Sequence, residues 1–294
     1  MIITSLKGGL GNQLFQYAFG RRMALQNNSP LQLDMSFFNT AKGNRPFSER
    51  PYELSVFKIH AEPASDGTIR RIKNSINNPI IRRLREQFPS LFHYKIFKEK
   101  SFEFDPEVNS LKGNLYLEGY WQSEKYFGSM EKDLRKEFVF LPQASEANLK
   151  ALDEIKNSNA VSLHIRRGDL VASKEAAEFH GVLPMEYYEK ALAMMMERVP
   201  GLRVFIFSDD PEWARSNSLF AGSTIIDWNQ GSRSYEDLRL MSNCKHHILA
   251  NSSFSWWGVW LNPSAEKIVI APKQWFRNPK INTSDLIPPS WIRI

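Results

Sequence analysis

Residues 161–170 read Val161-Ser-Leu-His-Ile-Arg-Arg-Gly-Asp-Leu170, and this stretch decides the fold. Its apolar side chains alternate with polar ones as far as Ile165, a pattern typical of a half-buried strand. Arg166, Arg167 and a glycine follow directly. A guanidinium offers a planar fork of donors that matches phosphate oxygens and stays charged. The stretch therefore predicts a strand that ends in a diphosphate-binding turn or, as the alternative, in a solvated basic turn.

Strand-like and helix-like segments alternate on both sides of this stretch. The expected strands are 161–165, 203–207, 224–226, 247–250 and 267–270. The expected helices are 185–197, 211–216, 235–242 and 254–261. This rhythm predicts a parallel sheet with helices on both faces, and in such folds ligands bind beyond the carboxyl ends of the strands.

The first half of the chain opens in a similar way but is less regular. Its expected elements are a strand at 2–6, a loop at 7–13, a helix at 14–26, and strands at 31–33 and 115–121. A linker-like stretch at 141–147 precedes a helix at about 147–157. We therefore expect two α/β domains, residues 1–150 and 151–294, with a basic insertion at about 39–100.

Composition restricts the class of protein. The 294 residues are 42% hydrophobic, which is enough for a sizeable core. The sequence has no apolar run of the roughly 18 residues that a membrane span needs, and no signal-peptide pattern at its start. The single cysteine, Cys244, excludes an internal disulfide and a cysteine metal cluster. These features favour a protein of a reducing cytoplasm.

The net charge of +6 is unevenly distributed. Residues 65–100 hold nine Lys or Arg and three acidic side chains, a surplus equal to that of the whole chain. Apolar residues run through the segment, which favours an amphipathic helix over a disordered arm. We expect either a solvated basic surface or peripheral contact with an anionic membrane. A nucleic-acid partner is not expected, because no base-reading motif accompanies the charge.

The stretch Gly8-Gly-Leu-Gly-Asn-Gln13 separates the first strand from the first helix. Gly9 and Gly11 let main-chain amides approach an anion, and the helix N-terminus behind them favours negative charge. The spacing departs from the dinucleotide fingerprint and from the Walker-type loop. Asn12 and Gln13 can hydrogen-bond to a sugar hydroxyl or a pyrophosphate oxygen.

Two further polar motifs follow predicted strands. Ser208-Asp-Asp210 could bind ribose or a metal, act as a base, or cap a helix. No Asp-X-Asp occurs in the chain, so the metal–nucleotide signature of one large transferase class is missing. The second motif, Asn251-Ser-Ser-Phe-Ser-Trp-Trp-Gly258, forms a second candidate anion cradle at a helix start, or a simple N-cap.

Two single residues complete the candidate site. His164 and Arg166 share one face of the strand by the period of two, so both could face one pocket, although a strand histidine is more often a core residue. Asp237 could accept two N–H bonds from a guanine edge, or be an ordinary surface carboxylate. Trp256, Trp257 and Trp260 are expected in the core.

Together these motifs resemble the bacterial-type α-1,2-fucosyltransferases of glycosyltransferase family 11. The matching stretches are Gly8–Ala18, His164–Asp169, Phe207–Asp210 and Asn251–Gly258. The resemblance implies a GT-B-like fold, with two Rossmann-like domains that face each other across a cleft and the donor bound mainly by the second. It also implies inverting, metal-independent transfer of L-fucose from GDP-β-L-fucose to the 2-hydroxyl of a terminal β-galactoside, with no cofactor.

The resemblance also implies roles for individual residues. Arg166 neutralises the β-phosphate of the leaving GDP, while Asn12 lies near the diphosphate or the fucose. His164 and Asp237 lie near guanine, and Asp169 is a candidate base that could instead hold an arginine. The other expected substrate-binding residues are Gly9, Gly11, Gln13, Arg167, Asp209, Asn251, Ser252, Ser253, Phe254 and Ser255.

Two rival functions remain open at this point. One is a GDP-sugar glycosyltransferase with another linkage or acceptor, and the other is a carbohydrate-binding protein without turnover. The retained Arg166 argues against the second. The sequence does not identify the acceptor, which could be a free oligosaccharide or an O-antigen glycan, or the oligomeric state.

Overall fold

The computed structural model describes residues 1–39 and 51–294, apart from the side chains of Asp169 and Ala172. Contacts within the chain define two compact units, here called unit 1 (described residues 1–39 and 51–139) and unit 2 (140–294). Residue 150, where the sequence places the domain boundary, falls inside helix α6 (Glu146–Lys156) of unit 2. The predicted cleft between the domains stays a prediction.

Unit 1 contains a five-stranded parallel sheet in the order β3-β2-β1-β5-β4. The strands are β1 (Ile2–Ser5), β2 (Leu31–Asp34), β3 (Glu62–Pro63), β4 (Lys95–Lys98) and β5 (Leu115–Glu118). The α-helices are α1 (Leu10–Gln26), α2 (Ser36–Asn39), α3 (Asp66–Asn77), α4 (Pro79–Gln87) and α5 (Glu131–Glu137). Its short 3-10 helices are η1 (Leu54–Val56), η2 (Pro89–Leu91), η3 (Pro106–Ser110), η4 (Glu124–Tyr126) and η5 (Gly128–Met130).

Unit 2 contains a six-stranded parallel sheet in the order β11-β10-β9-β6-β7-β8. The strands are β6 (Asn159–Ile165), β7 (Leu202–Ser208), β8 (Thr224–Ile226), β9 (His246–Ile248), β10 (Val269–Ala271) and β11 (Ile292–Arg293). The helices besides α6 are α7 (Gly168–Ala172), α8 (Lys174–His180), α9 (Met185–Arg198), α10 (Pro211–Ser216), α11 (Tyr235–Asn243), α12 (Ser253–Leu261), and the 3-10 turns η6 (Ser218–Phe220) and η7 (Gly231–Arg233). The predicted α/β class with parallel sheets is confirmed.

One boundary differs from the expectation in a way that matters for the site. Helix α1 begins at Leu10, although the sequence predicts a loop as far as Gln13. The amides of Asn12 and Gln13 both donate to the carbonyl of Gly9, at 2.9 and 3.1 Å, which closes the first helical turn early. Gly11, Asn12 and Gln13 therefore belong to the helix, which fixes the directions of the Asn12 and Gln13 side chains.

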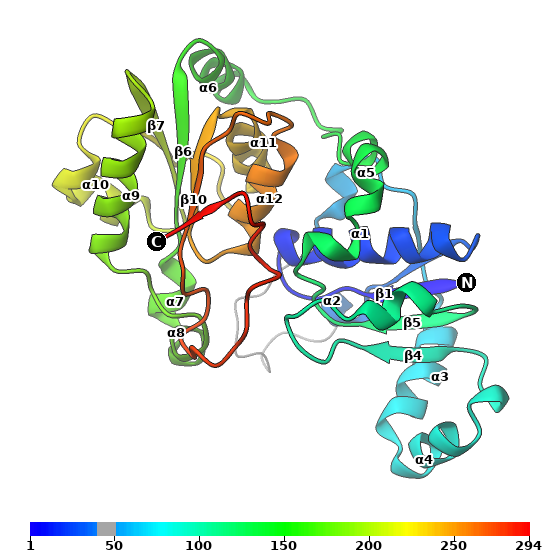
Figure 1. Cartoon of the computed structure of the whole chain (residues 1–294). Helices are drawn as coiled ribbons and strands as arrows, with labels where there is room; N and C mark the ends of the chain where they lie inside the picture. The colour runs from blue at the N-terminus through cyan, green and yellow to red at the C-terminus, as the bar shows by residue number, and fades with distance from the viewer. Residues whose placement is uncertain (40–50) are drawn as a thin grey trace. The chain divides into compact units, whose positions relative to one another are not determined.

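The two faces of the unit 2 sheet are covered by different helices (Figure 1). Val161, Leu163 and Ile165 of β6 pack into a core cluster with α9. Ala160 faces the other way, into a cluster with α6 and α11. This alternation is the period of two that the sequence shows. It places His164 and Arg166 on the side of the sheet that carries α6, α11 and α12.

The second of these core clusters contains the chain's cysteine. Cys244 is buried at the end of α11, and burial raises the pKa of its thiol well above the ordinary value. Trp256, Trp257 and Trp260 of α12 are buried, so their predicted place in the core is confirmed. No helix in the described part of the chain has the length and apolar composition needed to cross a membrane.

Candidate functional site

The strand order of unit 2 reverses between β6 and β9. From β6 the chain continues outward to β7 and β8, and from β9 it continues to β10 and β11 on the other side. The loops after β6 and β9 therefore diverge at the carboxyl edge of the sheet, the position where open α/β sheets bind ligands. These two loops carry the two most informative motifs of the sequence.

Strand register places Arg166 beside the loop that follows β9. Leu163 pairs with Ile248, so the chain beyond β6 runs alongside the chain beyond β9. The Nη1 atom of Arg166 donates to the carbonyl oxygen of Asn251 at 3.3 Å. The guanidinium and the start of α12 are thereby brought together, as the sequence predicts.

Arg167 contacts the loop that follows the neighbouring strand, β7. Its amide donates to Asp209 Oδ1 at 2.8 Å, and its Nε donates to Asp210 Oδ2 at 3.3 Å. Its guanidinium also lies 4.5 Å from the ring centroid of Trp213. These contacts favour a role for Arg167 in fixing the loop, so of the two guanidiniums Arg166 is the better candidate for the diphosphate.

The paired carboxylates after β7 divide between two tasks. Asp210 caps α10, because its Oδ1 accepts the amide of Trp213 at 3.2 Å. Asp209 is exposed and holds the amide of Arg167. The capping alternative is therefore correct for Asp210, while a ligand role for Asp209 stays a prediction.

Small residues shape the start of α12. Ser252 is its N-cap, and the Ser252 hydroxyl accepts the amide of Phe254 at 3.3 Å. Ser253 is half-buried. Ser255 is fully buried, and its hydroxyl donates to the carbonyl of Ser252 at 3.1 Å. Ser255 therefore shapes the turn from inside, and direct contact with a ligand does not fit its placement.

Asn251 lies at the centre of the loop after β9. It is 1% exposed, and its side-chain Nδ2 donates to the carbonyls of His180, Gly181 and Trp275 at 2.9, 3.1 and 3.2 Å. Its Oδ1 is buried and receives no hydrogen bond from the described residues. A buried acceptor in this state is costly, so the hydrogen bonds of the Asn251 side chain leave one polar atom of this loop unsatisfied.

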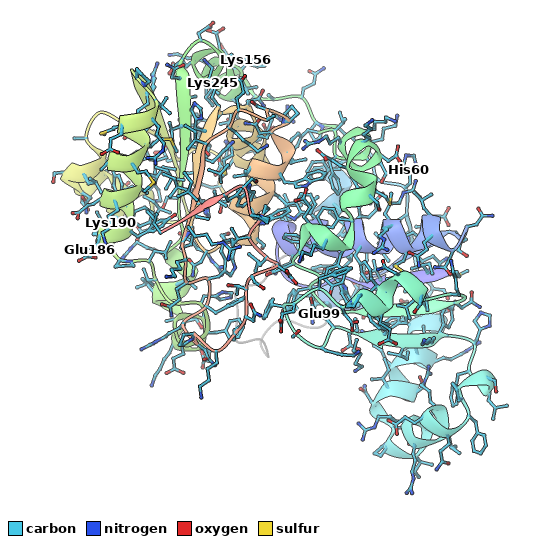
Figure 2. The ribbon with its side chains drawn as sticks, in the orientation of Figure 1. His60, Glu99, Lys156, Glu186, Lys190 and Lys245 are labelled. Carbon is cyan, nitrogen blue, oxygen red and sulfur yellow. The ribbon has the colours of Figure 1, made fainter. Side chains whose placement is uncertain are left out.

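A cavity of about 920 Å³ adjoins Asn251 on the α9 side of unit 2. Tyr187 and Trp275 contribute aromatic surface to it. Glu186 and Lys190, one turn apart on α9, contribute charge (Figure 2). Aromatic faces beside a few polar groups suit a sugar ring, which has apolar faces and hydroxylated edges.

His164 and Asp237 lie on the opposite side of the sheet from that cavity. The His164 ring is 8% exposed and 6.0 Å from the ring of Phe254. Asp237 lies on α11, and Asn229 Nδ2 donates to its Oδ1 at 2.9 Å. Burial raises the pKa of Asp237 from 3.8 to about 7, against the opposing effect of the Asn229 hydrogen bond.

A network that the sequence does not reveal holds the partner of Asp237. Asn148 and Asn229 exchange two side-chain hydrogen bonds, each 2.9 Å long. Trp228 Nε1 donates to Asn148 Oδ1 at 2.8 Å. Asn148 is contributed by α6, about 80 residues away in sequence, which is why no local pattern signals it. The network leaves Asn229 with a fixed donor for Asp237.

Unit 1 carries the glycine-rich start of α1, and a side chain of the protein already lies at this helix N-terminus. Glu53 Oε2 accepts the amide of Leu10 at 3.0 Å, so a carboxylate of the chain itself lies at the N-terminus of α1. The side chain of Gln13 donates to the carbonyls of Gly8 and Pro51 and accepts the amide of Glu53. The prediction that Gln13 contacts a ligand does not fit these contacts, because its side-chain amide already hydrogen-bonds to main-chain groups of the loop on both its nitrogen and its oxygen.

Gly8 and Asn12 fit each other closely at this helix start. Gly8 has φ +77°, and a Cβ added there would lie 2.5 Å from Nδ2 of Asn12. Gln122 donates to Asn12 Oδ1 at 2.7 Å. Asn12, Gly9 and Gly11 thus lie at the carboxyl edge of the unit 1 sheet, with Asn12 tied to the segment after β5. Their ligand roles stay predictions.

Glu99 is a residue at the same edge that the sequence analysis missed (Figure 2). Its two oxygens accept the amides of Tyr120 and Trp121 at 2.6 and 2.8 Å, and Trp121 has φ +59°. Lys7 Nζ lies 4.3 Å from the centroid of the Tyr120 ring. Burial raises the pKa of Glu99, although both amide bonds oppose this. In the sequence Glu99 is only one acid in a basic segment.

Two predictions concern residues outside the described part of the chain. The side chain of the candidate base Asp169 lies outside the described residues, as does the part of the basic insertion at 40–50. Within the described ranges, no three His, Cys, Asp or Glu side chains gather in a way that could hold a metal ion. Metal independence is nevertheless a prediction about the reaction.

Comparisons with known proteins identify the family. The family model "Glycosyl transferase family 11" matches residues 1–294. The chain is 36% identical over 310 residues to an Escherichia coli alpha-1,2-colitosyltransferase, covering 100% of this chain and 99% of that protein. It is also 36% identical over 313 residues to the O-antigen biosynthesis glycosyltransferase WbnK of E. coli, covering 99% of each.

More distant matches extend to eukaryotic proteins. Galactoside 2-alpha-L-fucosyltransferase Sec1 of Mus musculus is 24% identical over 275 residues, covering 89% of this chain and 64% of that protein. A solved structure of an Arabidopsis thaliana FUT1 mutant in complex with GDP matches with a TM-score of 0.52 and 10% identity, covering 91% of this chain and 69% of that chain. The predicted GT-B-like fold class is confirmed.

Proposed function

The chain belongs to glycosyltransferase family 11, and from this premise we propose that it transfers L-fucose from GDP-β-L-fucose to the 2-hydroxyl of a terminal β-galactoside, with inversion. One observation carries the proposal: Arg166 hydrogen-bonds to the loop that starts α12, at the point where the strand order of unit 2 reverses. A guanidinium and a helix N-terminus at one point make a site for a diphosphate.

The chemistry needs a positive site at this point. When the bond between fucose and GDP breaks, negative charge develops on the β-phosphate. Arg166 and the main-chain amides at the start of α12 are preorganised donors that stabilise this charge without first having to move. We therefore assign the leaving group to Arg166, Ser252 and Ser253. This assignment supports a reaction that proceeds without a metal ion.

The fucosyl carbon develops oxocarbenium character in such a transfer, so the attacking hydroxyl needs only modest activation. A carboxylate can take the proton of that hydroxyl as the new bond forms. Asp169 directly follows the diphosphate motif in sequence and stays our candidate for this role. We place the sugar of the donor in the cavity that adjoins Asn251, where Tyr187 and Trp275 contribute aromatic surface.

Asp237 is proposed as the guanine-selecting residue. A carboxylate can accept from the two adjacent N–H groups on the guanine edge, which adenine and uracil do not offer in the same arrangement. Asn229 fixes the side chain from one side. Because burial raises the pKa of Asp237 to about 7, the protonated and ionised forms coexist near neutral pH, and guanine would bind the ionised form.

A second donor, GDP-colitose, is favoured by one observation, the 36% identity to an alpha-1,2-colitosyltransferase over the whole chain. Colitose is fucose that lacks its 3-hydroxyl, so the two donors differ by one hydrogen-bonding group. A site built to bind that hydroxyl would reject the deoxy sugar strongly. The ratio of kcat/KM for the two donors therefore decides between them.

The first test is calorimetric titration with GDP in the presence of EDTA. We expect metal-independent binding, preference for GDP over ADP and UDP, and loss of binding in Arg166→Ala. The matched control is Arg198→Ala on α9, whose guanidinium donates to a carbonyl of its own helix. Absence of GDP binding by the wild type, or equal binding by Arg166→Ala, would contradict the proposal. Acceptor screening with lactose and O-antigen fragments follows.

A further inference from the structure

Unit 1 exposes a row of large apolar side chains on α4 and η2. Ile80, Leu84, Phe88 and Leu91 are 73%, 44%, 51% and 76% exposed. The first three follow one another at intervals of four residues, so they line one side of the helix. We call this side, with these four residues, the α4 face. The Proposed function makes no use of it.

The neighbouring helix shows why this exposure is unusual. Ile69 and Ile72 of α3 are buried against Ile3 and Tyr116 of the sheet. Helix α4 is also amphipathic, but it contributes no buried residue to the described structure. Figure 1 draws α4 beyond α3, at the far end of unit 1 from the sheet. Its apolar side is therefore not explained by the core of unit 1.

One flank of α4, next to the α4 face, is anchored to the rest of unit 1 through Arg85. Arg85 donates to the carbonyl of Tyr94 at 2.6 Å, just before β4. Its guanidinium also lies 4.5 Å from the centroid of the Phe92 ring. With Arg85 fixed on one side, a rotation of α4 that would hide its apolar side chains would break both contacts.

The two helices of this segment also carry exposed cations. Arg82 and Arg83 lie on α4, while Arg70 and Arg71 lie on α3, and all four are exposed. They belong to the segment 65–100, which carries the +6 surplus. Apolar side chains beside arginines on an exposed helix are the pattern of a helix that lies in a membrane interface.

We infer that the α4 face docks unit 1 on a membrane surface that contains anionic lipid. The four apolar side chains would enter the boundary between headgroups and acyl chains, and the arginines would stay at the phosphates. A second copy of the chain fits less well, because a two-fold contact would bring two surpluses of +6 together. A nucleic acid fits less well too, because a phosphate backbone gives the apolar row no contact.

The test is vesicle flotation with the full chain. The anionic vesicles contain phosphatidylglycerol and phosphatidylethanolamine, and the neutral ones contain phosphatidylcholine alone. Two double variants remove one component each: Ile80→Ser with Leu84→Ser, and Arg82→Gln with Arg83→Gln. The matched control is Leu149→Ser with Met196→Ser, two side chains of unit 2 that are 57% and 59% exposed. Circular dichroism and thermal unfolding of every variant confirm that each remains folded.

The wild type should float with anionic vesicles at low salt and much less with neutral ones. Because a cation at an anionic surface contributes about a fivefold gain in partitioning, the arginine variant should bind roughly 25-fold less. The apolar variant should lose at least tenfold, and the control should match the wild type. Failure of the wild type to float, equal flotation of all variants, or concentration-dependent dimers that the apolar variant abolishes would overturn the inference.

Discussion

The N-termini of α1 and α12 differ in what the chain places beside them. Each helix follows a strand of a parallel sheet and begins among small residues. At α1, Glu53 supplies a carboxylate to the amide of Leu10. At α12, the cap is the neutral hydroxyl of Ser252, and Arg166 bonds to the adjacent carbonyl of Asn251. One helix start already has an anion, and the other has a cation next to it.

This difference teaches that a helix N-terminus does not by itself locate a ligand. The partial charge at a helix N-terminus is about half an elementary charge in both cases. The neighbouring full charge decides whether a phosphate is attracted. The comparison therefore supports our proposal that the diphosphate binds to unit 2, at the start of α12.

The largest expected effect follows from Arg166→Lys. Lysine keeps the charge but loses the planar fork, so kcat/KM with GDP-fucose should fall about 100- to 1,000-fold, the cost of one lost donor at developing charge. Arg198→Lys on α9 is the control and should keep full activity. Near-normal turnover by Arg166→Lys would show that the diphosphate is bound elsewhere, and the comparison would fail.

A smaller effect concerns Asp237 and is visible as a pH dependence. Guanine binding needs the carboxylate, so the affinity for GDP should rise as the pH increases through about 7 and level off above it. Below this pKa, each pH unit should weaken binding by up to about tenfold. Asp237→Asn should abolish this slope and the preference for GDP over IDP, which lacks the 2-amino group. Calorimetry between pH 5.5 and 8.5 measures both.

A pH-independent GDP affinity in the wild type would remove Asp237 from the guanine site. Asn229→Ala tests the hydrogen bond that Asn229 donates to Asp237. It should raise the pKa of Asp237 further, because it deletes a hydrogen bond that lowers that pKa. The pH midpoint of GDP binding should therefore move upward in this variant, which a merely structural role of Asn229 would not produce.

Glu53→Gln tests the role of the carboxylate at the N-terminus of α1. The variant keeps the shape of the side chain but removes the anion at α1, so the free energy of unfolding should fall by about 1 kcal/mol. Urea denaturation measures this loss. The GDP affinity should stay unchanged. A clear change in that affinity, in either direction, would mean that unit 1 takes part in binding the diphosphate.

The smallest effect is expected for Ser252→Gly. Glycine replaces a serine N-cap at a cost of only about a few tenths of a kcal/mol, so the melting temperature should hardly move. The GDP affinity should nevertheless fall severalfold, because a hydroxyl beside the phosphates is lost. Ser65→Gly, at the N-cap of α3 in unit 1, is the matched control. If both variants bind GDP with the affinity of the wild type, Ser252 serves only as the N-cap of α12.

The sequence predicts those parts of the molecule that depend on local pattern. The alternation in β6 and the helix-forming run of α9 are visible within a few residues, and so is the motif at Arg166. From these the parallel sheet of unit 2 and its carboxyl edge follow. The early start of α1 escapes prediction, because glycines at 9 and 11 suggest a loop although Gly9 accepts the first helical hydrogen bonds.

Partners that are distant in sequence account for most of what was missed. Glu53 reaches α1 from 43 residues away, and Asn148 reaches Asn229 from 81. Glu99 holds the turn after β5 only because β4 and β5 are paired in the sheet. The contacts that commit Arg167 and Gln13 to the protein itself have the same origin. A motif shows which side chains are available, and the fold determines which of them the protein has already used.

The buried Cys244 has a practical consequence for labelling. It is the chain's single cysteine, and its thiol combines full burial with a raised pKa, so thiolate for alkylation is scarce. Maleimide reagents should therefore leave the native protein unmodified. A cysteine introduced by Leu91→Cys would be the sole reactive thiol, and an environment-sensitive dye attached to it would report polarity at the α4 face without background signal.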